Sequence, residues 1–90
     1  MPETRKLVVE GNVQGVFYRQ STKEVANTLG ITGTVKNLPN GNVEIIATGD
    51  TRQLQQLEDW CNQGPPRAVV TRLSTTPLPL QTFKYFTIIR

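Results

Sequence analysis

The chain has 90 residues, of which 37% are hydrophobic and 19% charged, and its formal net charge is +3. This length and composition allow one small ordered domain over residues 1–90, and the scattered basic residues give no nucleic-acid footprint, only a mild preference for anions. The absence of histidine and the presence of a single cysteine, Cys61, exclude Ser/His and Cys/His catalysis, an internal disulfide and the usual zinc sites.

A glycine-containing loop follows the first predicted strand, which is centred on residues 7–9. The loop runs from Gln14 into a helical pattern at Arg19, and Gly15 lets its backbone bend closely. Several unpaired N–H groups and the dipole of the helix can then favour one anion. Arg19 adds a permanently charged planar fork that suits a phosphoryl group. We therefore interpret residues 14–19, here named the anion loop, as a phosphate-binding segment.

The helix that follows has two possible starts. Apolar residues at helical spacing predict a helix that ends at Gly30, a favourable residue for a C-terminal cap. Ser21 and Glu24 have the spacing of a capping box, which would begin the helix at Ser21. A beginning nearer Tyr18 would instead aim more free N–H groups at the anion loop.

The pattern changes to a period of two residues from Ile31, which predicts a second strand over residues 31–38. The sequence Leu38-Pro39-Asn40-Gly41 predicts a turn, because proline presets its first central position and glycine accepts the positive φ that closes a hairpin. Residues 43–48 alternate again and predict a third strand.

A second helix is predicted to begin at Gly49-Asp50-Thr51 and to end before Gly64-Pro65-Pro66. One apolar stripe runs along this helix and should lie on the sheet. We interpret the stripe as core and not as a functional cluster. Its members are Leu54, Leu57, Trp60 and Cys61.

Two β-rich stretches complete the chain, at residues 68–75 and 83–89, with an irregular segment at residues 77–79 between them. The predicted order is β-α-β-β-α-β with an added terminal strand. This order favours an α+β sandwich in which two helices cover one face of a mostly antiparallel sheet, as in the ferredoxin-like fold. The pattern does not place the last strand in the sheet, and the fold by itself assigns no function.

Two long motifs stand at residues 11–19 and 33–44. The first reads G-x-V-Q-G-V-x-[FY]-R without a gap, and the second reads G-x-V-x-N-x-x-x-G-x-V-E. Both resemble the signatures of the acylphosphatases. Residues 60–68 resemble the helix-end segment of the family, and the aromatic final stretch fits too, so the resemblance covers nearly the whole chain. Leu38 stands where some members have threonine, which removes a hydroxyl from that position.

This resemblance implies hydrolysis of the carboxyl–phosphate bond of acyl phosphates, without metal or cofactor, to a carboxylate and inorganic phosphate. It implies that Arg19 and Asn37 are catalytic. The residues that it implies for binding the substrate phosphoryl group are Gln14, Gly15, Val16, Phe17, Tyr18 and Arg19.

The residue chemistry agrees with this reaction. Phosphoryl transfer spreads charge over the outer oxygens, so positioning and electrostatic stabilisation by Arg19 and the loop N–H groups are the main requirements. A carboxylate leaving group is a weak base, which removes the need for an acid such as the missing histidine. We hypothesise that the Asn37 carbonyl orients the attacking water, that its NH₂ donates to a phosphoryl oxygen, and that a phosphate oxygen finally takes the proton.

Several of these residues also have simpler interpretations. Asn37 could serve only as a turn residue, while Phe17 and Tyr18 fit packing and loop-wall positions better than substrate contacts. The alternative function is a non-catalytic phosphate- or nucleotide-binding module of the same fold. An RNA-binding module is disfavoured, because no predicted strand carries the run of aromatic residues that such a surface uses.

The expected partners are a small acyl phosphate as substrate and inorganic phosphate as product or competing ligand, with no nucleic acid and no membrane. No segment approaches membrane-spanning length, and the charged residues at the start precede no apolar leader. We therefore expect a free-standing cytoplasmic monomer. The sequence does not identify the acyl group of the substrate.

Overall fold

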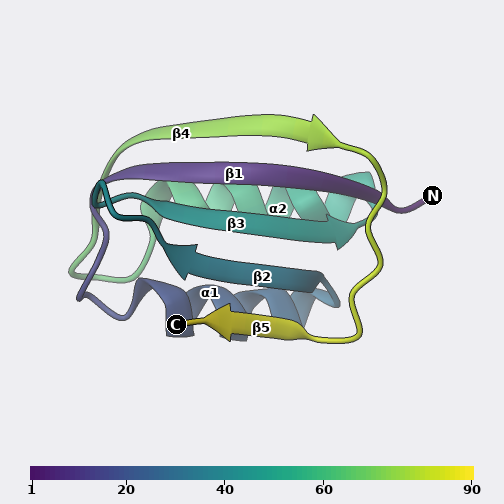
Figure 1. Cartoon of the computed structure of the whole chain (residues 1–90), viewed down its shortest axis with the longest axis horizontal. Coiled ribbons are helices and arrows are strands. Elements are labelled where there is room, and N and C mark those ends of the chain that lie inside the picture. Colours follow the sequence, from purple (N-terminus) through teal and green to yellow (C-terminus); the bar gives the residue numbers. More distant parts are fainter.

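The elements follow the order β1-α1-β2-β3-α2-β4-β5 in the computed structural model, which describes residues 1–90 (Figure 1). This is the predicted order, with the added terminal strand. The helices are α1 (Tyr18–Leu29) and α2 (Thr51–Gln63). The strands are β1 (Glu3–Asn12), β2 (Thr32–Asn37), β3 (Val43–Gly49), β4 (Val69–Leu78) and β5 (Phe86–Ile89).

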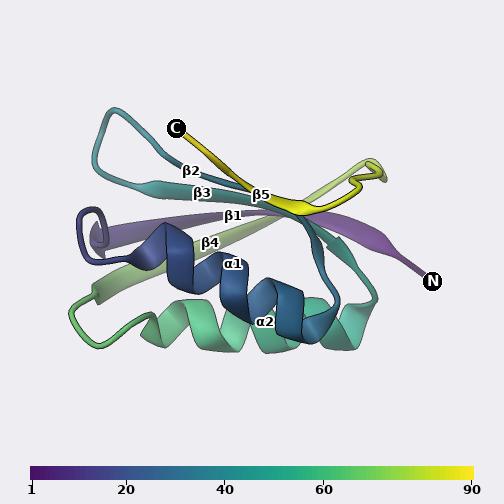
Figure 2. The same cartoon turned by 90° about the horizontal axis from the view of Figure 1, so that it is seen from below.

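All strands join one sheet in the order β4-β1-β3-β2-β5. Every neighbouring pair is antiparallel except β2 and β5, which run parallel. Figure 2 shows both helices on one face of this sheet. The predicted ferredoxin-like α+β sandwich is therefore confirmed, and β5 takes the edge beside β2, a position that the sequence pattern left open.

The core fills the space between the sheet and the helices. Alternate residues of β1 and β3, such as Leu7 and Ile45, are fully buried, and Trp60 of α2 packs against their cluster while partly exposed. Burying one such aliphatic side chain contributes about 1.5–3 kcal/mol of hydrophobic stabilisation. The predicted apolar stripe of α2 is thus confirmed as core. Its buried members are Leu54, Leu57 and Cys61.

Helix α1 begins at Tyr18, so the capping box of Ser21 and Glu24 is wrong as its start, and the alternative start is confirmed. Phe17 is the N-cap residue, in the left-handed conformation with φ 64° and ψ 22°, and no side chain caps the helix. Ser21 lies within the first turn, where its N–H donates to the Phe17 carbonyl at 3.0 Å. Gly30 ends the helix as predicted, with φ 77°.

Helix α2 begins with a complete capping box. The Asp50 carboxylate accepts a hydrogen bond from the Gln53 N–H at 2.8 Å, and the Gln53 side-chain oxygen accepts one from the Asp50 N–H at 2.9 Å. These bonds satisfy donors that a helix start otherwise leaves free. Neither helix is long and apolar enough to cross a membrane.

Replacing Asp50 with alanine should lower the free energy of unfolding by about 1 kcal/mol, because the Gln53 N–H loses its acceptor. Urea denaturation followed by circular dichroism measures this change. The matched variant Asp50→Asn keeps an acceptor and should lose much less. An alanine variant with the midpoint of the wild type would show that this cap does not stabilise the fold.

Strand β4 is longer than predicted. Residues 77–79 were expected to be irregular, but Pro77 pairs with Arg5 of β1 inside the ladder. This pairing is allowed because β4 is an edge strand whose only neighbour is β1. No second neighbouring strand needs a hydrogen bond from the N–H that proline lacks. The prediction is therefore wrong for the first two of these residues. Strand β5 also begins later than the predicted stretch 83–89, at Phe86.

Candidate active site

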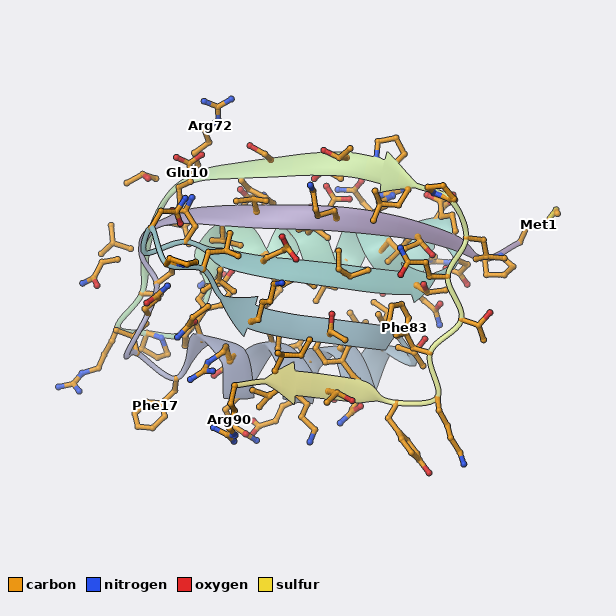
Figure 3. The ribbon with its side chains drawn as sticks, viewed as in Figure 1. Met1, Glu10, Phe17, Arg72, Phe83 and Arg90 are labelled. Atoms are coloured by element: carbon orange, nitrogen blue, oxygen red, sulfur yellow. The ribbon has the colours of Figure 1, made fainter.

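A pocket of about 400 Å³ opens where the β1–α1 loop, the end of β2 and the end of β5 meet. Two arginines and no Asp or Glu side chain line it, which favours an anionic ligand. Figure 3 shows the side chains of Phe17 and Arg90 at this end of the molecule. The structure thus brings the two predicted catalytic residues to one pocket. Its lining includes Gly15, Phe17, Arg19, Asn37, Ile88 and Arg90.

The backbone of the anion loop leaves its donors free. No N–H group from Gln14 to Gln20 donates to a protein acceptor, and the first N–H of this region that does so belongs to Ser21. Gly15 and Phe17 have positive φ of 74° and 64°, on either side of a residue of the opposite hand. Such alternation turns successive N–H groups to one concave side, where the positive end of the α1 dipole also acts.

Arg19 lies in the first turn of α1, and its guanidinium contacts the end of β5. Its Nη1 donates to the Ile89 carbonyl at 3.3 Å, and no other protein acceptor engages its fork. The remaining donors are therefore free to meet an anion in the pocket. Sequence reasoning missed this bond and the lining residues Ile88 and Arg90, because all of them depend on the pairing of β5 with β2.

Asn37 ends β2, and its Oδ1 is the only buried side-chain oxygen or nitrogen of the chain that lacks a hydrogen-bond partner in the protein. Leaving such an acceptor unpaired costs about 1–3 kcal/mol. The adjacent turn does not use this side chain. The turn is closed by the Leu38 N–H, which donates to the Asn42 carbonyl at 2.8 Å, and by the Asn42 N–H, which donates to Asn40 Oδ1 at 3.1 Å. The interpretation of Asn37 as a turn residue therefore has no hydrogen bond to support it.

Gln14 joins the anion loop to the β2–β3 turn. Its Nε2 donates to the carbonyls of Leu38 and Asn42, at 2.8 and 2.9 Å. The neighbouring loop residue Val16 packs against the core. Neither side chain lines the pocket, so these two residues can reach an anion there only through their backbone. The Gln14 bonds fix the loop relative to Asn37, which lies beside Leu38 at the end of β2.

Replacing Gln14 with alanine should reduce kcat/KM for an acyl phosphate by about tenfold, because the loop can then shift relative to the β2 end. Losing both hydrogen bonds should also lower the free energy of unfolding by about 1–2 kcal/mol. Steady-state kinetics and urea denaturation measure the two effects. The exposed residue Gln55 offers the control Gln55→Ala, and equal activity of both variants would show that the Gln14 bonds do not position the loop.

Tyr18 is a core residue, unlike its neighbour Phe17. Its ring centroid lies 5.5 Å from that of Trp60, and its hydroxyl donates to the Cys61 carbonyl at 2.7 Å. Burial raises the pKa of Tyr18 far above its ordinary value and raises the pKa of the Cys61 thiol to about 12, so neither group ionises near neutrality. The expectation of packing is confirmed for Tyr18 and Cys61. Phe17 does not pack, because the left-handed backbone leaves this side chain 73% exposed, and it lines the pocket as a loop-wall residue.

The fold and the site together define a class of protein. Free N–H groups at a helix start, an arginine with unused donors and a pocket without Asp or Glu side chains lie together on a ferredoxin-like sandwich, an arrangement that suits a phosphoryl-type oxyanion. The chain has no group of three His, Cys, Asp or Glu side chains that could hold a metal ion.

Comparison with known proteins identifies the family. The sequence model described as acylphosphatase matches residues 5–88. The chain is 53% identical over 73 residues to an acylphosphatase of Marinobacter nauticus, a match that covers 81% of this chain and 79% of the relative. The solved acylphosphatase of Bacillus subtilis superposes with a TM-score of 0.95 at 33% identity over 100% of both chains. That of Coxiella burnetii gives 0.95 at 34% identity over 98% of this chain and 93% of its own. The chain belongs to the acylphosphatase family.

Proposed function

We propose that this acylphosphatase hydrolyses acyl phosphates by dividing the reaction between two parts of its pocket. The anion loop and Arg19 hold the phosphoryl group, and Asn37 orients the water that attacks it. The observation that carries this proposal is that Asn37, Arg19 and residues of the anion loop line one pocket, where the donors of the loop and of Arg19 are unused and the buried Oδ1 of Asn37 has no protein partner.

The phosphoryl group is the part of the substrate that these donors suit. Its outer oxygens carry the negative charge, which spreads further as the bond to the acyl oxygen lengthens. The N–H groups from Gln14 to Gln20 form no hydrogen bond within the protein and the Arg19 fork forms one, so these donors are available to the phosphoryl oxygens. Preorganised donors of this kind stabilise the transition state with little rearrangement during the reaction.

The attacking water needs orientation more than it needs a strong base. Asn37 Oδ1 accepts a hydrogen bond from this water, while the amide NH₂ donates to a phosphoryl oxygen. The water oxygen then bonds to phosphorus as the bond from phosphorus to the acyl oxygen breaks. The carboxylate leaves with the electron pair of that bond, and a phosphate oxygen takes the proton of the water. No protein group has to gain or lose a proton, since a carboxylate is a weak base.

Hydrolysis of benzoyl phosphate in the presence of a chelator tests this function. We expect turnover in proportion to enzyme concentration, with inorganic phosphate as a competitive inhibitor. A folded protein that binds inorganic phosphate without turning over the substrate would instead support the alternative, a non-catalytic phosphate-binding module. Calorimetric titration with phosphate separates these two results.

We further propose that residues 1–90 form a single domain that acts as a monomer. The core that supports the pocket is one cluster that runs from β1 to β5. The cytoplasmic location stays a prediction from the sequence.

A further inference from the structure

Phe17 is placed in a way that neither packing nor backbone geometry explains. It is the only non-glycine residue of the chain with a positive φ, and its large apolar side chain is 73% exposed at the pocket. A left-handed backbone is unfavourable for a residue with a bulky side chain. An aromatic ring that stays exposed to water also contributes little hydrophobic stabilisation. Both costs meet at one residue beside the candidate active site, where strained residues often have a function.

The anion loop needs the backbone of this position but not its ring. The positive φ of Phe17 helps to turn the loop N–H groups together, and its carbonyl accepts the Ser21 N–H. Glycine or asparagine adopts this conformation at lower cost and would serve the backbone equally well. The next residue, Tyr18, already supplies the aromatic ring that packs in the core. The ring of Phe17 is therefore left without a structural role.

The location of the ring indicates which part of a substrate it would meet. Asn37 lies on the sheet at the end of β2, whereas the ring of Phe17 points outward from the loop, away from the sheet (Figure 3). The phosphoryl group is held by the loop backbone, so the remainder of the substrate has to extend from it toward the pocket opening. Ile88 also lines this pocket and adds apolar surface from β5.

We propose that Phe17 is a specificity-determining residue, whose ring contacts the acyl group of the substrate and favours apolar and aromatic acyl phosphates over small ones. This inference rests on the proposed function. The ring can stack on a benzoyl group but meets only a methyl group in acetyl phosphate. Contact that continues into the transition state raises kcat/KM for the larger substrate selectively.

The test compares kcat/KM for benzoyl phosphate with kcat/KM for acetyl phosphate in the same enzyme. In Phe17→Asn, which keeps a residue that tolerates the left-handed conformation, the ratio of the two values should fall about fivefold. A change in phosphate binding or loop order affects both substrates and cancels in the ratio. The variant Phe17→Tyr keeps the ring and should keep the ratio of the wild type.

Tyr85 offers the matched control, because it is 68% exposed and precedes β5, at the end of that strand away from the pocket. Tyr85→Asn should leave the ratio unchanged. A ratio in Phe17→Asn within about twofold of the wild type, with both substrates turned over, would overturn this inference and leave the proposed function intact. Wild-type protein that is folded and hydrolyses neither substrate would overturn both.

Discussion

Arg19→Ala should reduce kcat/KM for benzoyl phosphate by about 10³- to 10⁴-fold, the largest loss that we expect from a single side chain of this pocket. The guanidinium is the only permanent positive charge of the anion loop, and its donors are unused except for one bond to Ile89. Its removal weakens the binding of the ground state and of the transition state together. The inhibition constant of inorganic phosphate should therefore rise about 10- to 100-fold as well.

Two variants make this result specific. Arg19→Lys keeps a positive charge but lacks the planar fork, so it should recover phosphate binding more fully than turnover. Arg72→Ala removes an arginine at the β4 edge, far from Phe17 and the pocket, where its Nε lies 3.8 Å from Glu10 Oε2 (Figure 3). This control should retain wild-type kinetics. Normal phosphate affinity in a folded Arg19→Ala protein would mean that the guanidinium does not hold the phosphoryl group.

Asn37→Ala should reduce kcat by about 10²- to 10³-fold while the affinity for inorganic phosphate stays within about threefold of the wild type. We assign the Asn37 amide to the attacking water. In this variant the loop donors and Arg19 can still hold the phosphoryl group. Stability gives a second readout. Asn37 Oδ1 has no protein partner, so its removal breaks no hydrogen bond. The melting temperature should therefore not fall through the loss of a hydrogen bond to this oxygen.

The neighbouring turn supplies the control for Asn37. Asn40 Oδ1 accepts the Asn42 N–H at 3.1 Å, so Asn40→Ala removes a turn contact close to the pocket but outside its lining. This variant should lose some stability and keep its kcat. If Asn37→Ala weakened phosphate binding as strongly as Arg19→Ala, the division between water orientation and phosphoryl binding would be wrong.

Glycines of the two sequence motifs serve different purposes, which the motifs alone do not reveal. A Cβ on Gly15 would meet no atom within 4 Å, so this glycine provides only the positive φ of the anion loop. A Cβ on Gly33 would lie 1.9 Å from the Ile46 carbonyl oxygen, so that glycine is required by the close approach of β3. One motif glycine therefore shapes the site, and the other permits the sheet that carries Asn37.

The sequence by itself determined the order of the elements and indicated the main candidate site residues. Helix and strand periods, the start at Asp50 and the end at Gly30 are local features, because they depend on backbone preferences and on the alternation of apolar residues along a few turns. The two motifs likewise indicated Arg19 and Asn37, which both line the pocket in the structure.

Only the tertiary structure decided what surrounds these residues. The place of β5 depends on which edge of the sheet is available to the last strand of the chain. The hydrophobic periodicity of a short segment does not reveal such long-range pairing. That pairing brings the Ile89 carbonyl to Arg19, and Arg90 to the pocket. The exposure of Phe17 was also invisible, because the same apolar residue packs inward in a helix but is turned to solvent by a left-handed N-cap.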